Sequence, residues 1–149
     1  MLLISHRGNI SGRLIELEND PTYIEHALQL GFDVEVDVWF NDDAWWLGHD
    51  LPQYKIDYEF LTKNGMWIHC KNLNAFHKLY EKNELNYFWH ENDKLVLTSR
   101  GQIWLLVGQP VTKNCICVLP ELSSYTMLEL QNCYGICSDY VENYKEFIL

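Results

Sequence analysis

The chain has 149 residues, which is the length of one domain and excludes two full domains. It contains 21 acidic and 11 basic residues, and its formal charge of −10 argues against nucleic acid as the main partner. Hydrophobic residues make up 48% of the chain and aromatic residues 14%, which is enough to form a core and excludes a disordered protein.

The first elements predicted along the chain are a strand and a helix. Residues 2–5 form a short apolar run that ends at the tripeptide HRG, a pattern typical of a buried strand followed by a glycine-containing loop. Asp20 and Pro21 are a typical helix start, with a carboxylate N-cap and proline at the first helical position. Apolar residues then keep helical spacing up to Gly31, so a helix is predicted over 21–30.

Residues 32–40 alternate strictly and predict a strand. One face carries Val34, Val36 and Val38, and the other carries Asp33, Glu35, Asp37 and Trp39. In an ordinary amphipathic strand the acids face water and the valines face the core. In a closed parallel barrel the valines pack outward under helices and the acids point into the barrel mouth. Glu35 and Asp37 would repel each other unless a cation or basic side chains lay between them.

The remainder of the chain predicts short strands with few helices between them. Strands are expected at 45–47, 66–70, 87–89, 95–97, 103–107, 115–119 and 135–137, with a tight turn at Arg100 and Gly101. Helices are expected at 73–81, 122–131 and 141–147, the last one capped by Asp139. This order predicts an α/β fold that is shortened in its second half.

Polar residues lie at or just beyond the ends of several predicted strands. They are His6 and Arg7, then Glu35 and Asp37, then His49, and finally His69 and Lys71. Because the carboxyl ends of parallel strands share one rim, we expect these side chains to converge. Carboxylates are hard oxygen ligands that suit Ca²⁺ or Mg²⁺. The other candidates, His26 and His77, are predicted to lie on solvated helix faces.

In this order the clusters closely resemble the glycerophosphodiester phosphodiesterase family. The family pattern is HRG, a helix, ExD on the second strand and a hairpin ending in HD, and the corresponding segments here are ISHRGN, ENDPTYIEHALQLGFD, VEVDVWF and WWLGHDLP. The resemblance is clear over residues 3–52. Beyond them, WIHCKN resembles the third-strand motif and GICSDY the end of the last strand, while residues 82–121 align by strand order alone.

The resemblance implies a shortened (β/α)8-type TIM barrel with a divalent metal ion in its mouth, formed by residues 1–149 as one domain. It implies metal ligation by Glu35, Asp37 and the residue at position 69, acid and base roles for His6 and His49, and phosphate binding by Arg7 and Lys71. A metal ion and a guanidinium would offset the charge that develops at phosphorus, and histidine suits proton transfer near neutral pH. The assignment of acid and base to the two histidines stays open.

The chain departs from the family pattern at position 69, where the family usually has a glutamate. His69 is a neutral and softer ligand, which adds Mn²⁺ or Zn²⁺ to Mg²⁺ and Ca²⁺ as candidate ions. Glu91 would restore the missing carboxylate, or His90 would line the pocket, and a surface loop is the alternative for both.

Length is the second departure, because barrels of this type usually have about 200 residues or more. Either short loops replace the later helices or the barrel is incomplete. Apolar outer surface would then be covered by the many Trp and Tyr residues, or by a second copy of the chain in a homodimer.

The expected function is that of a metal-dependent phosphodiesterase acting on a small glycerophosphodiester or a related sugar or lipid headgroup diester. Two alternatives stay open: a catalytically silent barrel that binds a phosphorylated ligand, and a lyase-type enzyme that releases a cyclic phosphate, as in the related phospholipase D toxins. No membrane span and no secretory signal are predicted. The five cysteines lack zinc or redox spacing, so reduced, mostly buried thiols in a cytoplasmic protein are expected.

Overall fold

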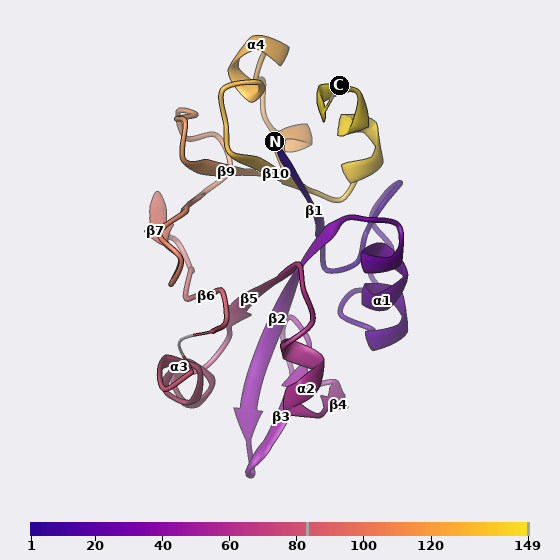
Figure 1. Cartoon of the computed structure of the whole chain (residues 1–149), viewed down its shortest axis with the longest axis vertical. Helices are drawn as coiled ribbons and strands as arrows, with labels where there is room; N and C mark the ends of the chain where they lie inside the picture. The colour runs from indigo at the N-terminus through magenta and orange to yellow at the C-terminus, as the bar shows by residue number, and fades with distance from the viewer. Residues whose placement is uncertain (83, 149) are drawn as a thin grey trace.

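The structure is a computed structural model that describes residues 1–82 and 84–148. Within these residues, ten strands form one mixed sheet that curves into a half-barrel (Figure 1). Parallel pairing runs in the order β6 (Tyr87–Phe88), β5 (Met66–Cys70), β2 (Asp33–Asn41), β1 (Leu2–His6), β10 (Gly135–Ser138), β9 (Cys115–Val118) and β8 (Ile103–Leu105). Antiparallel pairs attach β3 (Ala44–Leu47) to β2, β4 (Tyr54–Ile56) to β3, and β7 (Leu95–Leu97) to β8.

The helices are few and short. The α-helices are α1 (Pro21–Gln29), α2 (Tyr58–Leu61), α3 (Leu73–Tyr80) and α4 (Met127–Leu130), and η1 (Pro120–Leu122) and η2 (Val141–Ile148) are 3₁₀ helices. The predicted start of α1 is confirmed, since the carboxylate of Asp20 accepts hydrogen bonds from the backbone N–H groups of Thr22 and Tyr23. The predicted helix over 122–131 is wrong: Ser123 is extended, and a capping box of Thr126 with Glu129 starts a single turn there.

The predicted TIM barrel is also wrong. A (β/α)8 barrel alternates eight parallel strands with eight helices. Here 23% of the chain is helical, the sheet contains antiparallel pairs, and short loops connect most strands from β6 onward. A hydrogen bond from the N–H of Ser99 to the carbonyl of Tyr87 joins the chain after β7 to β6. The predicted hairpin of β7 and β8 around Gly101, which adopts a positive φ of 83°, is confirmed.

The two faces of the sheet have different side chains because residues alternate along each strand. On β2, the three valines are fully buried in the core that also contains Ile24 of α1 and Leu79 of α3. The inner face carries a second cluster, formed by Ile4, Trp67, Phe88, Trp104, Ile116 and Cys137. Glu35 and Asp37 point to this inner side and are also buried, so they are not the solvated face of an amphipathic strand.

Two further expectations can be compared with the structure. All five cysteines are free and buried, as predicted. Among the described residues, no helix has the length and apolar character needed to cross a membrane.

Candidate functional site

The carboxyl ends of β1, β5, β8 and β9, together with Glu35 from the first half of β2, surround one pocket of about 280 Å³. Its polar lining consists of His6, Arg7, Glu35, His49, His69, Lys71, His90 and Glu91. The pocket therefore contains six of the seven side chains expected to converge. The seventh, Asp37, is fully buried behind the wall and contacts Arg7, His69 and Lys71.

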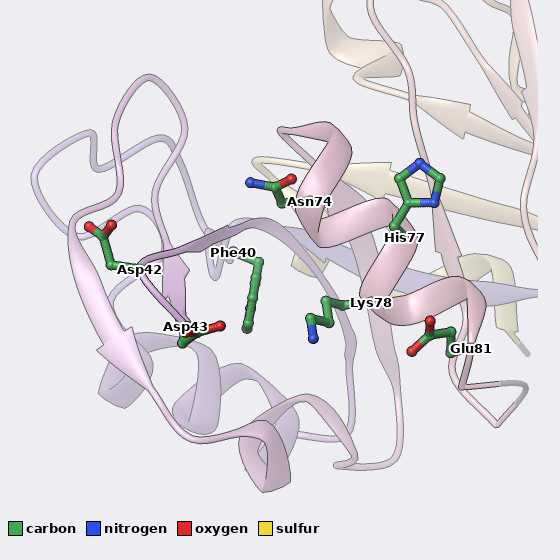
Figure 2. A pocket seen from close by; sticks show the side chains of 7 residues that line it. All are labelled: Phe40, Asp42, Asp43, Asn74, His77, Lys78 and Glu81. Carbon is green, nitrogen blue, oxygen red and sulfur yellow. The ribbon is translucent and has the colours of Figure 1, made fainter.

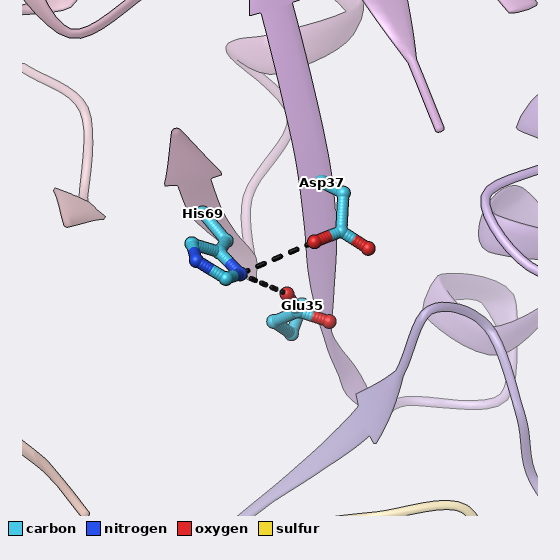
Figure 3. Close-up of side chains that lie close together, drawn as sticks. All are labelled: Glu35, Asp37 and His69. Carbon is cyan, nitrogen blue, oxygen red and sulfur yellow. Dashed lines mark ion pairs between the residues drawn. The ribbon is translucent and has the colours of Figure 1, made fainter. Parts of the chain in front are cut away.

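Glu35, Asp37 and His69 form the closest cluster in this site (Figure 3). The Nδ1 atom of His69 lies 3.1 Å from Asp37 Oδ1 and 3.5 Å from Glu35 Oε1. One potential ligand atom from each residue lies within 4.8 Å of the others. Ligands on opposite sides of one ion are separated by about 4–5 Å, which is twice the usual metal–ligand distance. The spacing therefore suits a single cation.

The hydrogen bonding of the three residues also fits a cation. Glu35 Oε2 and Asp37 Oδ1 are buried and accept no aligned hydrogen bond from any residue that the structure describes. Both oxygens lie near histidine nitrogens, Glu35 Oε2 at 3.9 Å from His6 Nε2 and Asp37 Oδ1 at 3.1 Å from His69 Nδ1, and a bound cation would replace the proton on His69 Nδ1. The carbonyl oxygen of His90 lies 2.7 Å from His69 Nε2, and because a carbonyl only accepts, Nε2 is the donor and Nδ1 faces the carboxylates. The donor set of two carboxylates and one imidazole suits a divalent ion.

The electrostatics of the cluster follow from its burial. Burial lowers the pKa of His69, but Asp37 and Glu35 outweigh this effect and raise the pKa to about 9. Burial acts to raise the pKa of Asp37, but the neighbouring His69, Arg7 and Lys71 outweigh it and hold this pKa far below its usual value. Asp37 is therefore ionised, and the positive charges of Arg7, His69 and Lys71 surround it.

Arg7 and Lys71 both reach the pocket wall but differ in their contacts. Arg7 is 8% exposed, and its Nε atom lies 2.8 Å from Asp37 Oδ2 in an ion pair without hydrogen-bond alignment. Its NH1 atom donates to Glu18 Oε2 at 3.1 Å. Lys71 Nζ lies 3.5 Å from Asp37 Oδ1. Arg7 is thus held firmly between two carboxylates, while Lys71 is the less constrained cation.

His6 is oriented by Asp139, a residue for which the sequence predicts a different role. Its Nδ1 atom lies 2.7 Å from Asp139 Oδ1, and its Nε2 atom lies 3.9 Å from Glu35 Oε2. Burial acts to raise the pKa of Asp139, but hydrogen bonds from His6 and Asn9 outweigh it and lower the pKa. The prediction that Asp139 caps the last helix is replaced by this contact, in which an ionised carboxylate accepts a hydrogen bond from the Nδ1–H group.

His49 lies on the short loop that connects β3 to β4. Its Nδ1 atom is 2.7 Å from Asp50 Oδ1, and its side chain is 41% exposed. The loop is held by a hydrogen bond from Trp39 Nε1 to the carbonyl of Gly48. A Cβ atom at Gly48 would collide with the carbonyl of Leu51, so the turn that presents His49 requires glycine. His49 also lines a second pocket of about 520 Å³.

The structure also shows where the other candidate residues lie relative to this pocket. His90 and Glu91 line the pocket, with His90 supplying its carbonyl to His69 and Glu91 accepting a hydrogen bond from Trp89. His26 and His77 are exposed on their helices, as predicted. His77 lines a separate pocket of about 430 Å³ between the β2–β3 turn and α3, where Lys78 lies over the Phe40 ring (Figure 2). That pocket contains none of the seven predicted site residues.

Two polar residues of the loop before α1, Glu18 and Asn19, belong to the site but are not predicted from the sequence. Asn19 donates to Asp37 Oδ2 and accepts from the Asp37 backbone N–H, both at 2.9 Å. Glu18 accepts hydrogen bonds from Arg7, Asn9 and Arg13. These contacts depend on left-handed backbone at Arg7 and Asn19, with φ of 56° and 64°. The one feature of the sequence that could have indicated these contacts is the polar stretch that follows HRG.

Comparison with known proteins gives no relative. No protein-family model matches the chain, and neither the curated proteins nor the solved structures contain a match. The chemistry of the site must therefore be argued from its own residues.

Proposed function

We propose that this protein is a metal-dependent phosphodiesterase that hydrolyses a small glycerophosphodiester or a related diester by histidine acid–base catalysis. One observation carries the proposal: a single small pocket contains His6 and His49, each with a carboxylate at Nδ1 that is not part of the Glu35–Asp37–His69 cluster, beside two basic side chains and that cluster. The resemblance of the HRG, ExD and HD segments to glycerophosphodiester phosphodiesterases supports the same reaction.

His6 acts as the general base in this mechanism. Asp139 accepts a hydrogen bond from Nδ1–H, which leaves the lone pair on Nε2, the ring atom on the side of Glu35 and the pocket. Nε2 takes a proton from a water molecule, and the water oxygen forms a bond to phosphorus. Positioned proton transfer of this kind typically contributes about 10²- to 10⁴-fold to the rate.

His49 acts as the general acid. Its Nδ1 atom lies 2.7 Å from Asp50 Oδ1, and its side chain lines both the site pocket and the second pocket. The bond from phosphorus to the leaving alcohol breaks as His49 gives its proton to the alkoxide oxygen.

Glu35, Asp37 and His69 would hold the metal ion, which supplies Lewis-acid compensation for the charge that develops on the phosphate oxygens. Lys71 binds a non-bridging phosphate oxygen, because its contact with Asp37 is long enough to be exchanged. Arg7 adds its positive field from a fixed position between Asp37 and Glu18. These charges let an acidic protein hold a phosphodiester anion.

A second candidate function is that of a binding module for a phosphorylated ligand. Three carboxylates (Glu18, Glu35 and Asp37) already pair with four cations (Arg7, Arg13, His69 and Lys71), so these groups carry a formal charge of +1 without a metal ion. A net positive cluster of this kind also suits a site that holds an anion without cleaving it.

The decisive experiment measures release of phosphomonoester from a panel of glycerophosphodiesters with Mg²⁺, Ca²⁺, Mn²⁺ or Zn²⁺, and with a chelator. We expect turnover that needs a divalent ion and falls at least about 10²-fold in His49→Ala. His26→Ala is the matched control, because His26 is an exposed histidine outside both pockets around His49, and it should retain parental turnover and circular dichroism.

Other outcomes identify which part of the proposal fails. Protein with bound metal that cleaves no diester but binds glycerol phosphate would be a binding module. Turnover that survives the chelator would assign the compensating charge to Arg7, Lys71 and His69 in place of a metal ion. Accumulation of a cyclic phosphate would replace hydrolysis by a lyase reaction.

A further inference from the structure

The pocket has two walls with different chemistry. The histidines, Arg7, Lys71 and the carboxylates come from β1, β2, β5 and the loops that follow β3 and β6. The residues at and beyond the ends of β8 and β9 are all apolar: Trp104, Leu105, Leu106, Val107, Val118 and Leu119. β9 lies across the curved sheet from β2 and β5 (Figure 1). A molecule bound at the histidines therefore faces an apolar surface.

This apolar wall is open to a ligand and poor in hydrogen-bond donors. Leu106, Val107, Val118 and Leu119 are half-buried, so part of each remains accessible. The backbone N–H of Leu106 already donates to the carbonyl of Lys94, and that of Leu119 donates to the carbonyl of Cys137. A polyol on this wall would lose hydrogen bonds to water without replacing them, which is unfavourable.

We propose that the apolar wall binds an apolar substituent of the phosphodiester, a short alkyl or aromatic group on one of its two alcohols. The inference rests on the proposed function, because it places the phosphate beside His6 and His49. The charges of the polar wall complement the phosphate anion, and the apolar wall complements the substituent. A pocket of about 280 Å³ lies just below the roughly 300–1,000 Å³ of ordinary small-molecule sites, so the substituent is short.

The test compares two diesters that differ only in this substituent: glycerol phosphate esterified with methanol and with hexanol. Each buried methylene favours binding by about fourfold. We expect kcat/KM for the hexyl ester to exceed that for the methyl ester by about tenfold or more, because several methylenes contact the wall.

Isosteric variants show whether the preference arises at this wall. Val107→Thr and Val118→Thr keep the branched shape and replace one methyl group by a hydroxyl. Each should reduce the ratio of kcat/KM for the hexyl ester to kcat/KM for the methyl ester by about fourfold. Val111→Thr is the matched control, since Val111 is half-buried but packs against the outer core and not on the pocket. Equal turnover of the two esters by the parent, or an unchanged preference in both variants, would overturn the inference.

The experiment also separates this inference from the proposed reaction. If neither ester is cleaved, the phosphodiesterase proposal fails, and the dissociation constants of hexyl phosphate and methyl phosphate are then compared by calorimetry. Tighter binding of hexyl phosphate that is lost in Val118→Thr would still support the apolar wall. Equal dissociation constants would reject it.

Discussion

At the scale of single residues, the contact between His6 and Asp139 gives the sharpest prediction. Asp139→Asn keeps the size of the side chain but removes the charge that holds the Nδ1 proton, so Nε2 no longer reliably carries the lone pair. We expect kcat to fall by about 10²- to 10⁴-fold with little change in KM. Steady-state kinetics on the preferred diester, with circular dichroism to verify folding, measure this effect.

The control for this substitution is Asp93→Asn on the loop after β6. Asp93 is exposed, and its backbone carbonyl accepts a hydrogen bond from His90. Its side-chain carboxylate can therefore be neutralised without altering that hydrogen bond. Its kcat should match the parent. Parental kcat in Asp139→Asn as well would show that Asp139 does not orient a catalytic base, and would leave it as a structural partner of His6 and Asn9.

At the scale of elements, the success of sequence reasoning depended on the length and regularity of each segment. The alternation of 32–40 and the capped start at Asp20 predict β2 and α1 well, because each is set by local patterning. The three-residue β4 and the one-turn α2 are missed because neither is long enough to show a period. The (β/α)8 arrangement is overpredicted because a resemblance in the first 52 residues does not determine how later strands are connected.

The candidate site follows the same rule, because strand ends can be identified from sequence and loop conformations cannot. Convergence of His6, Glu35 and His69 follows from the shared rim of parallel strands. The contacts of Asn19 and Glu18 arise from left-handed loop backbone, which no local pattern specifies. Asp139 directly follows β10, so applying the strand-end rule to the last strand would have included it.

The N-cap of α1 gives an element-scale prediction. The carboxylate of Asp20 accepts hydrogen bonds from two backbone N–H groups, and Asp20→Ala should lower the free energy of unfolding by about 1 kcal/mol. This corresponds to a Tm lower by about 2–4 °C for a chain of this size. Asp57→Ala is the matched control, because Asp57 occupies the N-cap position of α2 but its side chain makes no capping hydrogen bond. Equal losses of Tm in both variants would contradict a capping role for Asp20.

At the scale of the whole molecule, two features affect stability in different ways: the buried polar site, and the short connections that follow β6. The short connections after β6 leave apolar side chains exposed, including Leu95 and Leu97 on β7 and Leu128 on α4. The sequence predicts that a second copy of the chain covers such apolar surface in a homodimer, and this stays a prediction. On the inner face, the buried carboxylates of β2 favour the fold only when positive groups from β1 and β5 surround them. Ligation of a cation would therefore tie neighbouring strands together.

Metal binding should accordingly stabilise the entire chain. At a metal concentration about 100 times the dissociation constant, the free energy of unfolding rises by about 2.7 kcal/mol, which raises Tm by about 5–10 °C. In Glu35→Gln this shift should largely vanish, because the variant loses the charge and one oxygen ligand of the cluster. Glu16→Gln, at an exposed glutamate outside the cluster, should retain the full shift in calorimetric scans with and without chelator. A metal-induced shift in Glu35→Gln equal to that of the parent would remove Glu35 from the ligand set, because Tm depends on the ion only through the groups that bind it.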